Sequence, residues 1–345
     1  MSHTLSDLGW SAHFMMQLSV EELETYTPAR ITSVHRAAVE ALTESGPRTL
    51  VTPPDLPTSG IAVGDWVMID DSALVIRLLD RLTTLSRRAS GEDARQQLLA
   101  ANVDTLFIVS SCNADFNPAR LERYLVLAES AGCQPVIVLT KPDLCDDADR
   151  YVAQAETLAP ALPVLALDAR DKDQAARLFD WWRKGQTAAL LGSSGVGKST
   201  LTATLTGQAL LTQDIREDDA KGRHTTTARN LYPATHGGWL VDTPGMRALR
   251  LHDASDGIDA VFADLTELAE GCKFRDCQHD TEPGCAIQAE IAAGRLDPAR
   301  LRRWQKLERE DARNSETLAE SRARNKALGK FYKRHQDEAK NRKGR

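Results

Sequence analysis

The apolar and polar positions of the chain follow three different patterns from one end to the other. Between Ala29 and Arg88, short β-rich stretches such as Val63–Ile69 and Ala73–Leu79 alternate with turn residues at close intervals, which predicts an N-terminal β-barrel of the OB type. Such barrels commonly bind RNA through a basic groove and stacked aromatic side chains. Because aromatic residues are scarce in this stretch, the pattern leaves open whether Trp66 contacts RNA or belongs to the core.

A second pattern, in which apolar segments alternate with helical ones, runs from about Ala89 to His252. Strands that are apolar along their whole length are typical of parallel sheets whose two faces are covered by helices. This part of the chain therefore predicts a central α/β domain. The expected strands are Thr105–Ser110, Val136–Leu139, Val164–Leu167, Ala188–Leu191 and Trp239–Val241, and the expected helices include Pro118–Ala131, Ala148–Leu158 and Gln174–Lys184.

The two ends of the chain differ from these regions. Residues 1–28 predict a partly ordered N-terminal arm, in which Trp10 and Phe14 could pack on the next domain. Residues 253–313 predict a mostly helical domain, with a long helix that begins at Pro298 after the capping residue Asp297. Residues 314–345 form a polar, basic tail. The sequence thus predicts a multidomain protein with a barrel (29–88), an α/β domain (89–252) and a helical domain (253–313).

Charge and composition narrow the classes of function. The net charge of −6 argues against a general nucleic-acid binder, but the segment from Arg300 to Arg345 carries sixteen Lys and Arg residues against seven Asp and Glu. This imbalance favours a local contact with a polyanion, with a solvated charged end as the alternative. No apolar run is long enough to span a membrane, and the N-terminus lacks the layout of a signal peptide. The six cysteines do not form a disulfide framework, so we expect a cytoplasmic protein.

The clearest chemical motif is GSSGVGKST at residues 192–200, which fits the phosphate-loop pattern and lies between an apolar strand and a helix. Backbone N–H groups and the helix N-terminus would bind phosphates there, the lysine would reach the outer phosphates, and the serine would hold Mg²⁺. An ordinary glycine turn is the alternative. The expected nucleotide-binding residues are Gly192, Ser193, Ser194, Gly195, Val196, Gly197, Lys198, Ser199 and Thr200, with Ser199 also a magnesium ligand.

Two further motifs follow strands of the same predicted sheet. In TKPD, the Asp143 carboxylate could accept two N–H bonds from guanine, and adenine offers a different donor pattern. In DTPG, Asp242 could hold Mg²⁺ directly or through water, and the Gly245 N–H could sense the γ-phosphate. Each motif is a common turn when it stands alone. The residues assigned to the nucleotide are Thr140, Lys141, Pro142, Asp143, Asp242 and Gly245.

A threonine-rich segment, GRHTTT at residues 222–227, lies between the phosphate loop and DTPG. One of its hydroxyls could complete the Mg²⁺ shell when the γ-phosphate is present and so order the loop. The alternative is a polar surface loop. The residues do not decide between Thr225, Thr226 and Thr227; we take Thr226 as the candidate ligand of magnesium and nucleotide.

The helical domain contains three cysteines and one histidine within fourteen residues. Three thiolates and an imidazole form a complete tetrahedral set for a structural Zn²⁺ ion, with no position left open for catalysis. Free or redox-active cysteines are the alternatives. The candidate zinc ligands are Cys272, Cys277, His279 and Cys285.

The order of these motifs is unusual, because the base-reading motif precedes the phosphate loop, the threonine-rich segment and DTPG. With a barrel in front and a zinc cluster behind, this order closely resembles the circularly permuted GTPases of the RsgA (YjeQ) family. The resemblance extends from about Ala29 to Arg313 and rests on GSSGVGKST, GRHTTT, DTPG and the Cys-Cys-His-Cys spacing.

The resemblance implies an enzyme that hydrolyses GTP to GDP and phosphate and acts late in the maturation of the small ribosomal subunit. It implies stimulation of hydrolysis by that subunit, and contacts of the barrel and the zinc domain with ribosomal RNA. We expect a monomer. His224 lies where the family's motif carries a histidine linked to catalysis. Met246 stands where many GTPases place a water-orienting Gln, which a thioether cannot replace, so His224 is the candidate catalytic residue, with an ordinary loop histidine as the alternative.

Two positions depart from the family pattern. Thr140 replaces the commoner Asn, and Leu167-Asp168-Ala169 stands where a Ser-Ala pair would brace the base. Base contacts from that second loop are therefore left open. Two other functions remain as alternatives: a phosphate-loop ATPase or kinase, and an RNA-binding scaffold with an inert nucleotide site.

Overall fold

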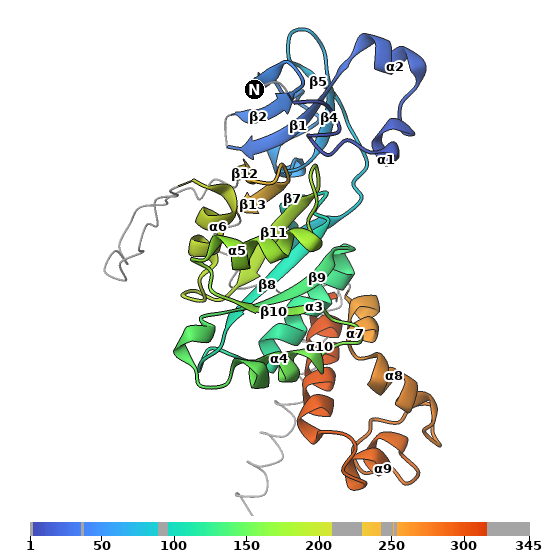
Figure 1. The fold of residues 1–345 in the computed structure, drawn as a ribbon. Helices are drawn as coiled ribbons and strands as arrows, with labels where there is room; N and C mark the ends of the chain where they lie inside the picture. Colours follow the sequence, from blue (N-terminus) through green and yellow to red (C-terminus); the bar gives the residue numbers. More distant parts are fainter. Residues whose placement is uncertain are drawn as a thin grey trace, which may run out of the picture.

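The structure is a computed structural model that describes residues 3–35, 38–88, 96–208, 230–242, 251 and 254–315. Five short strands near the N-terminus pair into a closed ring, drawn in blue in Figure 1. β1 pairs with β2 and β4, β2 pairs with β3, β4 pairs with β5, and a bridge between Val51 and Leu74 joins the remaining edges. The strands are β1 (Thr27–Val34), β2 (Val39–Thr43), β3 (Gly46–Leu50), β4 (Trp66–Ile69) and β5 (Val75–Leu78), with the 3₁₀ turn η1 (Thr58–Gly60) before β4.

Trp66 is buried, since the residue is only 1% exposed, but it packs in the main core together with the N-terminal arm; the separate core inside the barrel contains its neighbour Val67. The Trp66 ring lies 4.8 Å from that of Trp10 and 5.8 Å from that of Phe14, both in the N-terminal arm. The expected packing of these two side chains on the next domain is confirmed. Because its ring is covered, Trp66 does not offer a face to RNA. The arm contains two short helices, α1 (Ala12–Met15) and α2 (Val20–Thr25).

The central domain is built on six neighbouring strands in the order β10-β9-β8-β11-β13-β12. The first five are parallel, and β12 is antiparallel to β13. β12 also pairs with β1, so the barrel and the central sheet share one continuous hydrogen-bonded sheet. The predicted parallel sheet is thus confirmed, with bounds β8 (Thr105–Ser111), β9 (Gln134–Thr140), β10 (Val164–Leu167), β11 (Thr187–Gly192), β12 (Asn230–Pro233) and β13 (Trp239–Asp242).

Helices cover both faces of this sheet because its strands are apolar on both sides. Leu106 and Ile108 of β8 pack in the core below α3, whereas Phe107 and Val109 pack in a separate core below α5 and α6. The helix expected at Gln174–Lys184 is shorter than predicted, because the buried Trp182 belongs to the second core and the chain tightens into a 3₁₀ turn before it. The elements are α3 (Pro118–Ala131), α4 (Ala148–Glu156), α5 (Lys172–Ala176), α6 (Lys198–Thr206), η2 (Pro142–Leu144) and η3 (Arg177–Asp180).

A hairpin that the sequence does not predict, β6 (Thr84–Arg88) and β7 (Gln96–Ala101), leads from the barrel into the central sheet. At the other end of the molecule lie α7 (Ser255–Val261), α8 (Ala263–Glu270), α9 (Ala286–Ala292) and α10 (Pro298–Ser315) (Figure 1). The long helix expected from Pro298 is confirmed, and the Asp297 carboxylate accepts the N–H of Ala299 at 2.8 Å. Among the described residues, no helix is both long and apolar enough to cross a bilayer.

Candidate nucleotide site and metal centre

The phosphate-loop motif joins the end of β11 to the start of α6, as its strand-to-helix context predicts. A Cβ atom at Gly192 would lie 2.2 Å from the carbonyl oxygen of Val109, so a side chain cannot fit there. Gly195 and Gly197 have φ angles of +78° and +94°, in the region that L-residues rarely adopt. The glycines therefore allow the tight turn that directs backbone N–H groups toward a phosphate.

Two lysines lie against this loop. The Lys198 ammonium donates to the carbonyl oxygen of Ser193, and the Lys141 ammonium donates to that of Gly195 at 2.6 Å. The N-terminus of α6 adds its partial positive charge at the same place. The loop thus combines two cations, turning glycines and a helix N-terminus, the elements of a polyphosphate site.

Thr140 connects the base-reading motif to the phosphate loop. The side chain is fully buried, and its hydroxyl donates to the carbonyl oxygen of Val196 at 2.6 Å. Its oxygen also lies 3.1 Å from the carbonyl oxygen of Ser110. The threonine that replaces the commoner Asn therefore fixes β9 to the loop through its hydroxyl.

Sequence reasoning missed two arginines at this site. Arg170 lies 2.9 Å from the Asp143 carboxylate, and Arg120, in the first turn of α3, donates to the hydroxyl of Ser193. The partners of these arginines are 27 and 73 residues away along the chain. One signal in the sequence pointed to Arg170: Asp168 departs from the family pattern, and an acidic residue at this position calls for a nearby cation.

The remaining predicted nucleotide ligands are only partly described. Asp242 ends β13, and the register of Val241 with Ala189 of β11 places it at the same edge of the sheet as Gly192. Gly245 and Met246, which come next in the sequence, lie outside the described residues, as does the whole GRHTTT segment with His224, Thr225, Thr226 and Thr227.

The four predicted zinc ligands lie together between α8 and α9. Their ligand atoms are all within 4.8 Å of one another. The Cys272 and Cys285 sulfurs are 3.9 Å apart, and each is 3.5 Å from Nδ1 of His279. Zinc bonds of about 2.3 Å to sulfur and 2.0 Å to nitrogen in a tetrahedron require about 3.8 Å between sulfurs and about 3.5 Å between sulfur and nitrogen. Cys272, Cys285 and His279 therefore already have the spacing of zinc ligands, and Cys277 supplies the fourth donor atom within 4.8 Å of them.

Two backbone N–H groups are directed at sulfur atoms of this cluster. The Cys272 sulfur accepts the N–H of Ala286 at 3.4 Å, and the Cys285 sulfur accepts that of Gln288 at 3.5 Å. Both N–H groups belong to the first turn of α9, whose dipole favours negative charge. The His279 ring lies 5.6 Å from the ring of Trp304 on α10, which attaches the cluster to the long helix.

The fold and the loop define a phosphate-loop nucleotide-binding protein in which the predicted base-reading motif precedes the loop in the chain. The sequence model of the RsgA GTPase family matches residues 78–252. The chain is 51% identical to a protein of Mesorhizobium japonicum named small ribosomal subunit biogenesis GTPase RsgA, over 96% of this chain and 97% of that protein. It is 47% identical to a Vibrio parahaemolyticus protein named small ribosomal subunit biogenesis GTPase RsgA 2, over 96% and 92%. The chain therefore belongs to the RsgA GTPase family.

Two solved structures share the fold. YjeQ from Thermotoga maritima is 24% identical with a TM-score of 0.59, and covers 82% of this chain and 97% of its own. YloQ, described as a circularly permuted GTPase, is 23% identical with a TM-score of 0.58, and covers 85% of this chain and 97% of its own. The predicted circular permutation is thus confirmed.

Proposed function

We propose that this protein hydrolyses GTP while it assists the biogenesis of the small ribosomal subunit. The observation that carries the proposal is the 51% identity to a protein of that name along 96% of the chain. The nucleotide-site geometry supports it, because the base-reading motif and the phosphate loop meet at one edge of the sheet.

At this site, the phosphates are bound by the loop residues Gly192, Ser193, Ser194, Gly195, Val196, Gly197, Lys198, Ser199 and Thr200. Guanine is bound by the motif Thr140, Lys141, Pro142 and Asp143. Ser199, Thr226 and Asp242 hold Mg²⁺, which would offset charge on the β- and γ-phosphates. The N–H of Gly245 senses the γ-phosphate, and His224 orients the attacking water. Cys272, Cys277, His279 and Cys285 hold a zinc ion whose role is structural. The boundaries that we propose for the domains remain 29–88, 89–252 and 253–313.

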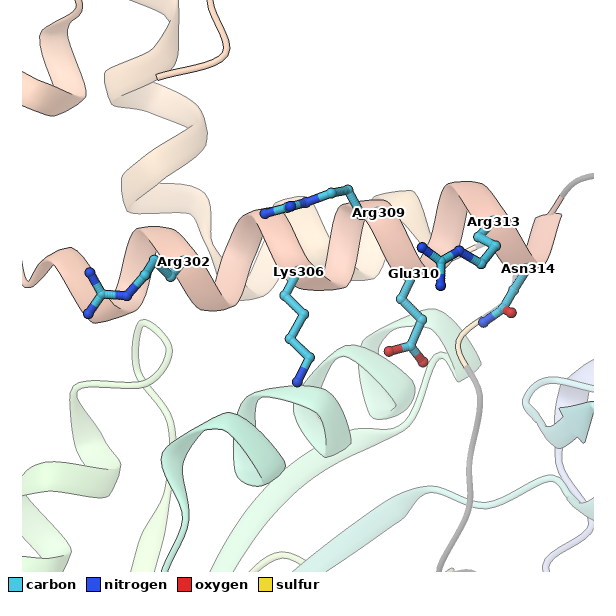
Figure 2. A pocket seen from close by; sticks show the side chains of 6 residues that line it. All are labelled: Arg302, Lys306, Arg309, Glu310, Arg313 and Asn314. Carbon is cyan, nitrogen blue, oxygen red and sulfur yellow. The ribbon is translucent and has the colours of Figure 1, made fainter. Parts of the chain in front are cut away.

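We further propose that the protein binds ribosomal RNA of the small subunit, as a cytoplasmic monomer. The support is a basic face on α10, shown in Figure 2, where four cations line a hollow of about 760 Å³. Arg302 and Arg309 also line a second hollow of about 780 Å³ beside the zinc cluster. Lysine and arginine side chains grouped in this way bind phosphates without sequence preference. The four cations are Arg302, Lys306, Arg309 and Arg313.

The decisive experiment measures phosphate release from GTP with and without purified small ribosomal subunits. We expect the subunits to accelerate hydrolysis by the wild type, and Lys198→Ala to abolish it. Lys172→Ala, which removes an exposed lysine of α5, is the matched control and should behave as wild type. An absence of stimulation would overturn the ribosomal part of the proposal. Equal competition by ATP and GTP would favour the ATPase or kinase alternative.

The same variant distinguishes the proposed function from the other alternative, an RNA-binding scaffold with an inert nucleotide site. If Lys198→Ala supports subunit association and maturation as well as the wild type does, the nucleotide site is dispensable and the scaffold is the better description. The contribution of α10 is measured by replacing Arg302 and Arg309 with alanine. Loss of two phosphate contacts should lower subunit affinity and reduce the slope of its salt dependence by about two.

A further inference from the structure

Arg170 joins two carboxylates at the guanine end of the nucleotide site. Its Nε and Nη2 atoms donate to Asp168 at 2.9 Å and 2.7 Å, and Nη2 also donates to Oδ2 of Asp143 at 2.9 Å. The backbone N–H of Arg170 adds a fourth bond, at 2.9 Å, to Oδ1 of Asp168. These hydrogen bonds from Arg170 hold the pKa of Asp168 below its usual value.

The sequence explains why a cation is needed here. Asp168 stands beside the carboxylate that reads guanine, and two neighbouring carboxylates disfavour each other's ionised form. An uncompensated charge at Asp168 would therefore repel the Asp143 carboxylate and favour its rotation away from the base. With Arg170 between them, the three side chains carry a net charge of −1, the same as Asp143 alone.

The geometry leaves Asp143 able to bind a base. Arg170 engages only Oδ2 of this side chain, and a carboxylate offers about four lone-pair positions. One oxygen and part of the second remain for the two N–H groups of guanine. The single bond from Arg170 restricts rotation of the carboxylate without filling its acceptor positions.

We propose that Arg170 is a positioning residue for guanine selection: it orients Asp143 and offsets the charge of Asp168. The inference rests on the proposed function, in which Asp143 reads the base. Lysine could not replace this arginine, because an ammonium group lacks the planar fork that engages Asp168 through two nitrogens while reaching Asp143.

The test compares the affinities of wild type, Arg170→Ala, Arg170→Lys and Arg170→Ala/Asp168→Ser for GDP, IDP and ADP. IDP lacks the 2-amino group of guanine, so the ratio of GDP to IDP affinity reports the second hydrogen bond to Asp143. Because the side chain of Arg170 is 66% exposed, we expect Arg170→Ala to weaken GDP binding by about two- to fivefold and to lower the ratio. Arg170→Lys should remain impaired, and the double variant should recover part of the loss. The control is Arg150→Ala, an exposed arginine of α4.

The salt dependence of GDP affinity distinguishes this electrostatic role from a defect in folding. In about 1 M salt, where exposed charges are screened, the difference between Arg170→Ala and wild type should shrink. The inference is overturned if wild type prefers GDP to ADP but Arg170→Ala keeps the wild-type GDP affinity and the wild-type ratio of GDP to IDP affinity. If wild type itself does not prefer GDP to ADP, the proposed base-reading role of Asp143 is wrong, and so is the inference that depends on it.

Discussion

At the scale of single residues, the conformation of the phosphate loop requires a residue without a side chain at Gly192. In Gly192→Ala, the added methyl group would lie 2.2 Å from the carbonyl oxygen of Val109, so the loop or β8 must move. We expect GDP affinity to fall more than tenfold and the free energy of unfolding to fall by about 1–3 kcal/mol. Isothermal titration and thermal unfolding measure both. Gly60→Ala is the control, since its nearest neighbour would be 3.8 Å away; wild-type GDP affinity in Gly192→Ala would contradict the assignment.

The residues of the site could be predicted from the sequence only where a local motif fixes them. The glycines, Lys198 and Thr140 are parts of short patterns, and the structure brings them together as expected. Arg170 and Arg120 reach the nucleotide motifs through Asp143 and Ser193, which are 27 and 73 residues away, so no local pattern links them to the site. The zinc ligands were predictable because all four lie within fourteen residues, which is close enough for one loop to hold them.

At the scale of elements, α3 connects the phosphate loop to the C-terminal helices. Its Glu122 is fully buried and lies 3.1 Å from Arg300 and 2.6 Å from Arg303, both on α10. In Glu122→Ala these guanidinium groups would lose their shared carboxylate, with Arg300 only 10% exposed. Removing one partner of a buried charge pair costs about 3–5 kcal/mol. We expect a loss near the lower end of that range in chemical denaturation, because Arg300 also pairs with Asp264.

The same helix supplies the control for this prediction. Arg123 pairs with Glu310 of α10, but both side chains are about a quarter exposed. Pairs that remain in contact with solvent contribute less than fully buried ones, so Arg123→Ala should cost about 1 kcal/mol, well below the loss in Glu122→Ala. Equal losses in the two variants would mean that the burial of Glu122 does not govern the attachment of α10.

The β12–β13 hairpin contains a histidine whose titration affects stability. His236 stacks on Phe179 at 3.9 Å and meets Trp182 edge-on at 4.4 Å. Burial lowers the pKa of His236, so the unfolded chain binds the proton first as the pH falls. Its contribution to stability is therefore present above about pH 6.5 and is lost as the pH falls toward the folded pKa.

His236→Phe tests this pH dependence, because phenylalanine retains the stacking and does not titrate. We expect acidification from about pH 7.5 to about pH 5.5 to lower the melting temperature of the wild type more than that of the variant. Parallel melting curves of the two proteins over this range would show that His236 does not contribute.

The sequence predicted long apolar elements better than short polar ones. The strands of the central sheet and α10 were predictable because continuous apolar runs and a proline–cap pair mark them. The β6–β7 hairpin was missed because its strands carry polar residues such as Ser86 and Gln97. The short 3₁₀ turn before Trp182 was missed because tertiary packing of an aromatic side chain, and no local periodicity, ends α5.

At the scale of the whole molecule, two different connections hold the outer parts to the central sheet. The barrel is attached through backbone pairing of β1 with β12 and through the arm, whose Asp7 carbonyl oxygen accepts the Trp239 indole N–H at 2.7 Å. The helical end is attached mainly through side chains of α10 against α3, and the cysteine–histidine cluster joins this end through Trp304 of α10. The cluster segment is thus the part whose order would depend most on a zinc ion held by the four ligands.

This arrangement predicts the result of removing zinc. Metal binding contributes directly to the folding of such a segment, whereas α10 remains attached to α3 through Glu122. Treatment with a chelator, or the Cys285→Ser substitution, should therefore allow trypsin to cleave after Lys273 and Arg275. Either change should also reduce the stimulation of GTP hydrolysis by small subunits, while GDP affinity changes by less than about twofold. Cys145→Ser, which removes a thiol outside the cluster, is the control for proteolysis and should leave cleavage at Lys273 and Arg275 unchanged. If GDP affinity instead fell in step with zinc loss, the helical end would be required for the nucleotide site itself, and the independence of the two attachments would be wrong.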